Sequence, residues 1–538
     1  MAIQSSITGA LVASLALFGA AHAAVDVDLT YFPTNPAGSI ANVVLDNYMG
    51  ISWELSSFNT LWGNNTSGTP KAMQNYLSNI AARISNPLRM RVGGDTMEFS
   101  NYSSALTKTM LKHLDVKKNY TVATTYGPVL FDVMNKMADD VGEMQFLTGL
   151  SMHKAPENGG DAEALKVASV ATEKLGSRLD AFLLGNEPDL YQDHKNRKVY
   201  NISDYIGEVD YIVNDLTTGP YGDLRSKDSL AGPSICCDWE LSDVLNAGLA
   251  GENYKYYAVQ HYPDIYCFGP TASNTNISNY LTHTSAVSYS GFQSAGVASA
   301  TAAGIPVIMS EANTCACGGC PLISPTFAAT LWEIDAFLAL AANNYSAAYI
   351  HTREYGVTYN LFDPPASRDP LDSDWKTGAT YYSALMMSEV MSKNGSIVVD
   401  MDIQNSKSNS DSHIATYGIY DLSASTGSTS RLGDMSQAQR GKFVFINYDN
   451  STSTTFQVPA NVASTIGLRY LLAPKVTEET DITWAGQTVG KEGKLKGSQE
   501  TKYVDCSGSD GCTIKVPGPG LVLALLNPNT TSSFYQEA

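Results

Sequence analysis

Short apolar runs alternate with amphipathic segments along the first three-quarters of the chain. Each run has 6 to 9 residues, the length of a buried parallel strand, and the runs cover 49–54, 87–95, 144–152, 181–189, 229–235, 256–263, 305–313 and 347–354. Apolar side chains recur every three or four positions between them, which predicts helices over 161–175, 202–216, 324–342 and 379–393. Eight strands with intervening helices predict a (β/α)8 TIM barrel and not a doubly wound sheet.

The pattern changes near residue 395, where helical periodicity fades. Apolar segments separated by Gly, Ser, Thr and Asn turns predict strands over 397–402, 413–420, 442–448, 453–458, 468–473 and 521–526. They indicate an α/β chain whose C-terminal part is an all-β sandwich. The alternating segment 25–31 is a candidate further strand of that sandwich, so that the sandwich would be built from both chain ends. The predicted divisions are a leader over 1–23, an N-terminal strand region over 24–45, the barrel over 46–394 and the sandwich over 395–538.

The first residues have the features of a secretory signal peptide. Residues 2–20 are uncharged, Leu11–Phe18 form an apolar core, and the small-x-small triplet Ala21-His22-Ala23 follows. The alternative is a membrane anchor, but the apolar run is too short to span a bilayer. We expect a secreted, extracellular protein without a membrane partner.

Charge excludes two classes of partner. Lys and Arg total 34 against 53 Asp and Glu, for a net charge of −19. A nucleic-acid binder needs a basic surface that this composition does not provide, and an anionic lipid surface would repel the chain. If the substrate is an anion, groups in the binding site must offset the repulsion from the net negative charge of the chain.

The eight cysteines are expected to form disulfides, as an even number does in a secreted chain. Cys506 and Cys512 flank a turn-rich loop and are predicted to pair. The other six form clusters after the predicted strands five, six and seven: Cys236 and Cys237, Cys267, and Cys315, Cys317 and Cys320. Half a zinc site is the alternative for the last cluster, but no His lies nearby. Ten Asn-x-Ser/Thr sequons also predict a glycoprotein.

Two carboxylates end strands of bulky apolar residues. Glu187 follows Asn186 at the end of predicted strand four, and Glu311 follows Ser310 at the end of strand seven. Strand C-termini of a barrel face its active site, so both side chains should meet at one mouth. Paired carboxyls suit glycoside hydrolysis, in which one protonates the leaving oxygen while the other attacks the anomeric carbon. Asn186 can hydrogen-bond a sugar hydroxyl beside the reacting centre.

Asn186-Glu187-Pro188 and Ser310-Glu311 resemble the signatures of retaining glycosidases of clan A. Across barrel and sandwich the chain is similar to glycoside hydrolase family 79, which contains β-glucuronidases and heparanases, and in particular to its secreted fungal members. The resemblance implies a retaining exo-β-glucuronidase with Glu187 as the general acid/base and Glu311 as the nucleophile. It implies neither a metal nor an organic cofactor.

The same resemblance implies the substrate-binding residues. Asp95, which ends Arg91-Val-Gly-Gly-Asp, would contact the sugar, and Tyr262 of Gln260-His-Tyr would orient Glu311. Gly318, Gly319 and Tyr359 would bind the uronate carboxylate, the glycines through an uncharged nest of N–H groups. Ser52 and Glu54 would contact outer hydroxyls.

The chain departs from the family pattern at Cys317, where an aromatic residue is usual. We expect disulfides among the three cysteine clusters to tie loops five, six and seven together; six cysteines allow 15 pairings. The expected partner is a glycan bearing terminal glucuronic acid, with 4-O-methylation left open. We expect the enzyme to be a monomer.

Three other functions remain open at this stage. The first is an endo-acting heparanase or hyaluronidase, which would need many basic residues along its cleft. The second is a clan relative that acts on neutral sugars. The third is a non-catalytic cell-wall protein that binds carbohydrate, although binding alone does not need two carboxylates at these positions.

Overall fold

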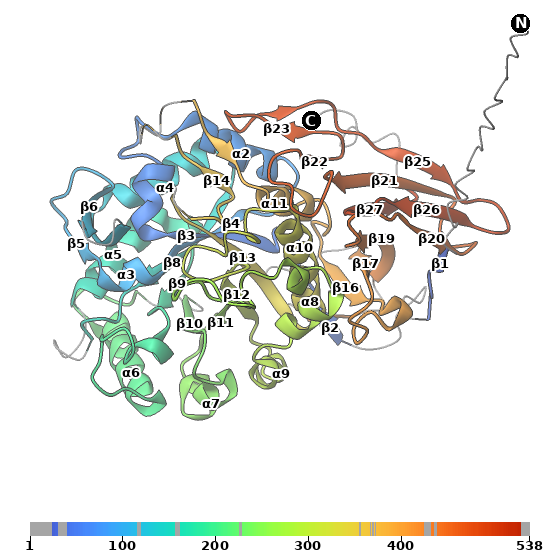
Figure 1. Ribbon diagram of the computed structural model, residues 1–538. Coiled ribbons are helices and arrows are strands. Elements are labelled where there is room, and N and C mark those ends of the chain that lie inside the picture. Colours follow the sequence, from blue (N-terminus) through green and yellow to red (C-terminus); the bar gives the residue numbers. More distant parts are fainter. Residues whose placement is uncertain are drawn as a thin grey trace, which may run out of the picture.

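The computed structural model describes residues 24–30, 40–115, 120–155, 162–224, 229–354, 357–365, 367, 371, 373–423, 432–434 and 438–528. Within these residues an α/β barrel lies beside a β domain (Figure 1). The predicted signal peptide over 1–23 lies outside the described residues. In the part of the chain that is described, every helix is too short or too polar to cross a bilayer.

Eight parallel strands close into a barrel, which confirms the predicted TIM-barrel architecture. All eight apolar runs supply one strand each: β3 (Met49–Glu54), β4 (Leu88–Gly93), β8 (Met144–Leu150), β9 (Leu179–Leu184), β10 (Leu230–Ile235), β11 (Tyr256–His261), β12 (Val307–Ala312) and β13 (Tyr345–Thr352). Strand β13 pairs with β3 and closes the ring. Small and bulky side chains such as Ala181, Ala258, Ile308 and Tyr349 fill its interior, so the barrel is packed and is not a pore.

Helices surround the barrel. They are α1 (Phe58–Leu61), α2 (Lys71–Ala81), α3 (Asp95–Phe99), α4 (Val129–Val141), α5 (Ala162–Leu175), α6 (Ile202–Thr218), α7 (Leu241–Asn246), α8 (His283–Ser290), α9 (Ser294–Ala302), α10 (Phe327–Ala342) and α11 (Tyr381–Met387). Helix α11 is shorter than the predicted 379–393. The chain turns after Met387, and Glu389 forms ion pairs with Arg83 and Arg469. Tertiary contacts therefore end a helix whose periodicity continues.

A small sheet between the second and third barrel strands was not predicted. It contains β5 (Asn101–Tyr102), β6 (Met110–Asp115) and β7 (Tyr120–Tyr126), in the order β5-β7-β6. The sequence of β7, Tyr-Thr-Val-Ala-Thr-Thr-Tyr, lacks the continuous apolar run by which the barrel strands were recognised.

The β domain contains a seven-stranded sheet and a three-stranded sheet. The larger has β16 (Ser396–Asp400), β17 (Ile414–Leu422), β19 (Ala438–Asn447), β27 (Gly520–Leu526), β21 (Thr465–Leu472), β22 (Thr483–Trp484) and β25 (Lys502–Asp505); the smaller has β1 (Val25–Asp26), β20 (Thr454–Val458) and β26 (Cys512–Val516). Short pairs join β2 (Ile40–Asn42) to β18 (Leu432–Asp434), β14 (Phe362–Asp363) to β15 (Lys376–Thr377) and β23 (Thr488–Val489) to β24 (Leu495–Lys496).

The larger sheet is buried on both faces. In β19, Val444 and Ile446 pack into the core shared with the barrel, whereas Phe443 and Phe445 pack into the core of the β domain. Side chains alternate between faces along a strand, so a strand covered on both sides reads as a continuous apolar run. Helix α10 lies between barrel and sheet and is buried all round, which is why it is apolar on every side.

The N-terminal segment joins the β domain. Strand β1 pairs in parallel with β20, and β2 pairs with β18. The β domain is therefore assembled from both parts of the described chain that flank the barrel, as the alternation over 25–31 suggested; Tyr31 itself lies outside the described residues.

A buried charged cluster also joins the barrel to the β domain. His283 of α8 contacts Asp335 of α10 at 2.9 Å through Nδ1 and Asp400 of β16 at 3.0 Å through Nε2. Tyr417 and Tyr448 donate their hydroxyls to the two oxygens of Asp335 at 2.6 and 2.7 Å. The two carboxylates hold the pKa of His283 at about 10, although burial opposes this. This cluster fixes the sheet against the helices of the barrel.

Candidate active site

The two predicted catalytic carboxyls lie at the ends of β9 and β12, two barrel strands that β10 and β11 separate. The backbone turns sharply after β9, because Gly185 and Glu187 both have positive φ, 69° and 51°. The N–H of Glu187 donates to the carbonyl of Ser234 in β10 at 3.1 Å. Glu311 lies within β12 itself. A left-handed conformation costs a non-glycine residue about 1 kcal/mol, so neighbouring contacts must hold Glu187 in place.

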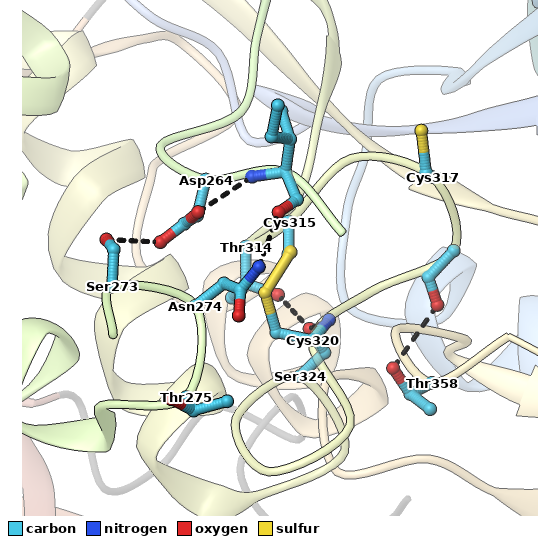
Figure 2. Close-up of a disulfide and its surroundings, with 12 residues drawn as sticks. Asp264, Ser273, Asn274, Thr275, Thr314, Cys315, Cys317, Cys320, Ser324 and Thr358 are labelled. Carbon is cyan, nitrogen blue, oxygen red and sulfur yellow. Dashed lines mark hydrogen bonds between the residues drawn. A yellow bond between two sulfur atoms is a disulfide. The ribbon is translucent and has the colours of Figure 1, made fainter. Parts of the chain in front are cut away.

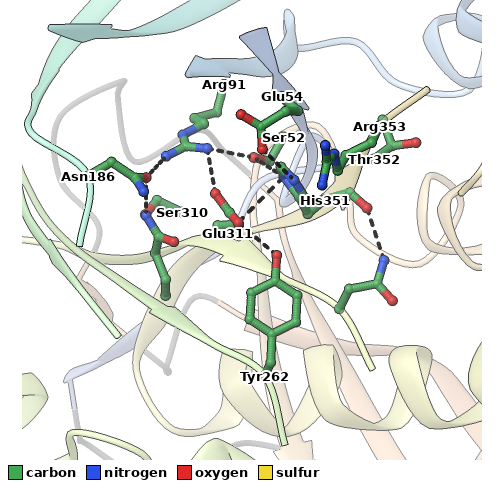
Figure 3. Close-up of polar contacts among 12 residues, drawn as sticks. Ser52, Glu54, Arg91, Asn186, Tyr262, Ser310, Glu311, His351, Thr352 and Arg353 are labelled. Carbon is green, nitrogen blue, oxygen red and sulfur yellow. Dashed lines mark hydrogen bonds and ion pairs between the residues drawn. The ribbon is translucent and has the colours of Figure 1, made fainter. Parts of the chain in front are cut away.

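Two hydrogen-bond donors hold the side chain of Glu311 from two sides (Figure 3). Arg91 donates from Nη1 to Oε2 at 2.6 Å, and Tyr262 donates its hydroxyl to Oε1 at 2.7 Å. The contact expected of Tyr262 is therefore present. The two donors restrict the carboxylate to one orientation, as a nucleophile requires.

Asn186 belongs to the same network. Its Oδ1 accepts from Arg91 Nη2 at 2.7 Å and from Gln260 Nε2 at 2.8 Å, and Gln260 also donates to Ser234 Oγ at 2.7 Å. These contacts leave the Nδ2 group of Asn186 without an acceptor in the described chain. It can donate to a ligand beside Glu311.

Glu187 has the electrostatics of a proton donor. Burial raises the pKa of its carboxyl well above the ordinary value, and the negative charges of Glu311 and Asp95 raise it further. Like charges that share a site cannot both ionise easily, so one carboxyl stays protonated while the other is charged. Of the two carboxyls, Glu187 is therefore the one suited to donate a proton.

His351 at the end of β13 joins Ser52 and Glu54 to the site. Ser52 Oγ lies 3.0 Å from His351 Nδ1 and accepts from Arg91 Nη1 at 3.2 Å. His351 Nε2 lies 3.5 Å from Glu54 Oε2, and Nδ1 lies 3.8 Å from Glu311 Oε1. Ser52 is thus fully buried behind the carboxylate.

Glu54 supports helix α3 and is not open to a ligand. Its Oε1 accepts from the backbone N–H of Thr96 at 2.9 Å and from the hydroxyl of the same residue. Burial alone would raise the pKa of Glu54, but the hydrogen bond from His351 and the charge of Arg353 hold it at about 2. Because both oxygens of Glu54 are engaged and Ser52 is buried, we leave these two residues out of the proposed sugar contacts.

Asp95 begins α3 at the barrel mouth, and its side chain is 54% exposed. One oxygen lies 3.7 Å from His194 Nδ1. Partial desolvation and the charge of Glu54 raise the pKa of Asp95 to about 6. Of the predicted sugar contacts on this side, Asp95 is the one whose carboxyl remains accessible.

The predicted glycine pair has the backbone of an anion nest. Gly318 and Gly319 are buried and have φ of 95° and 94°. Neither N–H donates to an acceptor within the described chain. A Cβ on Gly319 would lie 2.3 Å from Thr358 Oγ1, so only glycine fits there.

Tyr359 lies beside that pair. The N–H of Thr358 donates to the carbonyl of Gly318 at 2.7 Å, and its hydroxyl donates to the same carbonyl at 3.2 Å. The loop after β13 therefore contacts the loop that carries Cys317 and the glycines (Figure 2). Tyr359 is buried, and its ring lies 5.8 Å from that of His351. The predicted carboxylate-binding residues are therefore gathered on one side of the mouth.

Disulfides organise the loops that carry the glycines. Cys315 pairs with Cys320 on either side of the glycine pair (Figure 2). Cys317 pairs with Cys267 of the loop after β11. The predicted Cys506–Cys512 pair is also present. The expectation for the loop after β10 is wrong, because Cys236 and Cys237 bond to each other and leave that loop untied.

One group of ligand-type atoms in the described chain has the spacing of a metal site, and its chemistry does not suit one. It contains Asp189, Cys236 and Cys237. Both sulfurs are in the disulfide and cannot act as thiolates. Asp189 accepts the backbone N–H groups of Cys236, Cys237 and Asp238 at 2.7–3.1 Å. Asp189 is therefore a support for the loop and not a metal ligand.

Sequence reasoning did not assign roles to Arg91, Gln260, His351 or Arg353. A signal existed for Arg91 and His351, because each is a polar residue near the C-terminal end of a buried barrel strand. Such a residue is buried only when it has partners, and the C-terminal ends of barrel strands supply them.

Comparisons with known proteins agree with this geometry. Residues 397–523 match the model of the glycosyl hydrolase family 79 C-terminal beta domain. A β-glucuronidase of Neurospora crassa is 25% identical over 65% of this chain, and the chain covers 64% of that protein's length. A β-glucuronidase of Aspergillus niger is 25% identical over 84% of each chain.

Solved structures share the fold over almost the whole chain. A 4-O-α-L-rhamnosyl-β-D-glucuronidase from Fusarium oxysporum 12S is 19% identical, has a TM-score of 0.75 and covers 94% of this chain and 100% of its own. A GH51 arabinofuranosidase from Xanthomonas axonopodis pv. citri is 13% identical with a TM-score of 0.60, over 94% of this chain and 99% of its own.

A barrel with two carboxyls at its mouth and this C-terminal domain is the architecture of a glycoside hydrolase. Within that class, the C-terminal domain is that of glycosyl hydrolase family 79, and much of the chain is similar to fungal β-glucuronidases.

Proposed function

We propose that this protein is a secreted, monomeric, retaining exo-β-glucuronidase that removes terminal β-linked glucuronic acid from glycans. The observation that carries the proposal is that the two carboxyls, Glu187 and Glu311, have different surroundings. Glu311 accepts from Arg91 and Tyr262, and the pKa of Glu187 is raised by burial and by the charge of Glu311. Two carboxyls with these separate properties are what double displacement requires.

The proposed reaction has two steps. Glu187 protonates the glycosidic oxygen while Glu311 attacks the anomeric carbon, so that the C1–O bond breaks and a glycosyl ester forms on Glu311. Glu187, now a carboxylate, then removes a proton from a water molecule, which hydrolyses the ester and restores both groups. The Nδ2 group of Asn186 donates to the sugar hydroxyl next to the reacting carbon.

Three observations support the choice of a glucuronide. The N–H groups of Gly318 and Gly319 are unsatisfied in the described chain, and Tyr359 lies beside them. Unpaired N–H groups in a nest favour an anion such as the C6 carboxylate. The curated relatives are both named β-glucuronidases.

Four disulfides further support an extracellular location.

A panel of p-nitrophenyl β-glycosides tests the proposal. We expect hydrolysis of the glucuronide, with or without 4-O-methylation, to exceed that of the glucoside and xyloside by at least about 100-fold in kcat/KM. NMR of the first sugar released should show the β anomer. A faster reaction with the glucoside would disprove the substrate, and release of the α anomer would disprove retention.

A further inference from the structure

Arg353 is a partly buried cation at the barrel mouth that no step so far uses. It follows the last residue of β13 and lies near His351 and Glu54 (Figure 3). Its Nε is buried without a hydrogen-bond partner in the described chain, and no described carboxylate lies within ion-pair distance of its guanidinium. A buried guanidinium normally pairs with an anion, so we expect that of Arg353 to bind an anionic group of a ligand.

The neighbouring charges are already occupied by other groups. Glu354, the next residue, pairs with Lys112. Glu54 accepts from Thr96 and faces His351. The other arginine of the site, Arg91, is committed to Glu311, Asn186 and Ser52. Arg353 is therefore the cation that remains available around the described mouth.

The backbone holds Arg353 at one end of the loop that carries Tyr359. Asn360 closes the base of this loop, because its Oδ1 accepts from the N–H of Arg353 at 2.9 Å and its Nδ2 donates to the carbonyl of Glu354 at 2.9 Å. Asn313 of the preceding loop donates to the carbonyls of His351 and Tyr359 at 2.9 and 3.3 Å. The position of Arg353 relative to Tyr359 is thereby fixed before a ligand arrives.

The electrostatics place the guanidinium among the groups of the mouth. Burial raises the pKa of Tyr359, and the positive charge of Arg353 opposes that rise. The same charge opposes the rise in the pKa of Asp95 and contributes to the low pKa of Glu54. Arg353 therefore lies close enough to Tyr359, Asp95 and Glu54 for its charge to act on all three.

We propose that Arg353 binds the C6 carboxylate of the sugar together with the Gly318–Gly319 nest and Tyr359, and that it determines the preference for a uronic acid. This inference rests on the proposed function and changes one part of it. The carboxylate-binding site expected from the sequence, Gly318, Gly319 and Tyr359, contained no charged residue. A planar guanidinium can donate two parallel hydrogen bonds to one carboxylate. It also offsets locally the −19 net charge of the chain.

Kinetics with two substrates that differ only at C6 test Arg353. The wild type and Arg353→Met are compared on p-nitrophenyl β-D-glucuronide and on its uncharged methyl ester. We expect Arg353→Met to lower kcat/KM about 100-fold on the glucuronide and less than about threefold on the ester, since the lost contact is charge-assisted. Raising NaCl from about 0.05 to 0.5 M should weaken the wild type on the glucuronide and leave Arg353→Met unaffected.

Arg440→Met, on β19 of the distant sheet, is the matched control and should change neither substrate. Equal losses on both substrates, or no loss on the glucuronide, would overturn the assignment of Arg353. If circular dichroism shows that Arg353→Met is not folded, Arg353→Gln is subjected to the same comparison. A wild type that prefers the glucoside would instead refute the proposed function, so the two failures are distinguishable.

Discussion

At the scale of single residues, the site depends on a buried arginine that positions its neighbours and on the charges that surround Glu187. Arg91 is 1% exposed and connects Glu311, Asn186 and Ser52. The role of Glu187 depends on the charges around it. Residue identity alone shows which carboxyls are present, whereas the difference between them arises from burial and neighbours. The family resemblance implied different roles for the two carboxyls, but the physical cause of the difference required the fold.

Glu311→Gln should lower kcat at least about 10⁴-fold, because an amide cannot form the glycosyl ester. Its neutral side chain still fits between Arg91 and Tyr262, so the thermal unfolding midpoint should change by only a few degrees. Glu143→Gln, an exposed position beside β8, is the control for loss of one carboxylate. Residual activity above one per cent would show that another group is the nucleophile.

The pH profile should report Glu187. The active form has Glu187 protonated, so kcat/KM should fall as pH rises through its pKa, and the raised pKa keeps the enzyme active at pH values where an ordinary carboxyl has ionised. We expect an optimum on the acidic side of neutrality. Asp95→Asn removes a charge that raises this pKa, so it should move the basic limb of the profile to lower pH.

Asp243→Asn, at an exposed position of α7, makes the same charge change far from the mouth and should leave the limb in place. A basic limb that is identical in wild type and Asp95→Asn would contradict the assignment of the limb to Glu187.

At the scale of elements, the loops after β11, β12 and β13 form one connected unit. The Cys267–Cys317 bond, the Thr358-to-Gly318 hydrogen bond and the contacts of Asn313 join them. The loop after β10 is separate, because its two cysteines bond to each other. The connected unit supports the glycine nest.

Gly319→Ala should reduce kcat/KM on the glucuronide at least about tenfold and destabilise the fold by about 1–3 kcal/mol. A Cβ there would lie 2.3 Å from Thr358 Oγ1 and 3.0 Å from the Tyr359 nitrogen, at a φ of +94°. Gly222→Ala is the matched control, because Gly222 has a φ of +76° with open space around it. Similar losses in both variants would show that backbone strain alone, and not the nest, explains the effect.

Elements buried on both faces were predictable from the sequence. The eight barrel strands and the strands of the large sheet have continuous apolar runs because both faces are covered. The hairpin β6–β7 lacks such a run, and the end of α11 depends on distant ion pairs of Glu389. The motifs located Glu187 and Glu311, but the pairing of the cysteines and the partners of Arg91 required the fold.

At the scale of the whole molecule, the barrel and the β domain share a core and a buried ionic cluster. Helix α10 is covered on every side, partly by the barrel and partly by the large sheet. His283 lies between Asp335 and Asp400 across that boundary. The two parts should therefore unfold together.

His283→Gln should destabilise the protein by about 3–5 kcal/mol at pH 6, since it leaves two carboxylates buried without a counter-charge. The pKa of His283 rises from 6.5 in the unfolded chain to about 10 in the fold. The folded state binds more protons between these values, so the stability that this group contributes is complete below pH 6.5 and is lost as pH rises through 10. Urea unfolding should show the gap between variant and wild type narrowing from pH 6 to 9.

The control for that experiment is His113→Gln, an exposed histidine on β6, which should shift unfolding little at either pH. A gap that stays constant with pH would mean that His283 is uncharged in the fold.

The pairing of β1 with β20 has a consequence for how the chain is made. Val25 leaves the ribosome more than four hundred residues before its partner Phe456, and the sheet that covers α10 is translated after the barrel. During that interval the nascent chain exposes an apolar helix and an unpaired strand edge, the surfaces on which aggregation begins. Yield should thus be limited by chaperone capacity in the producing cell, and a host that translates the last hundred residues quickly should recover more native enzyme.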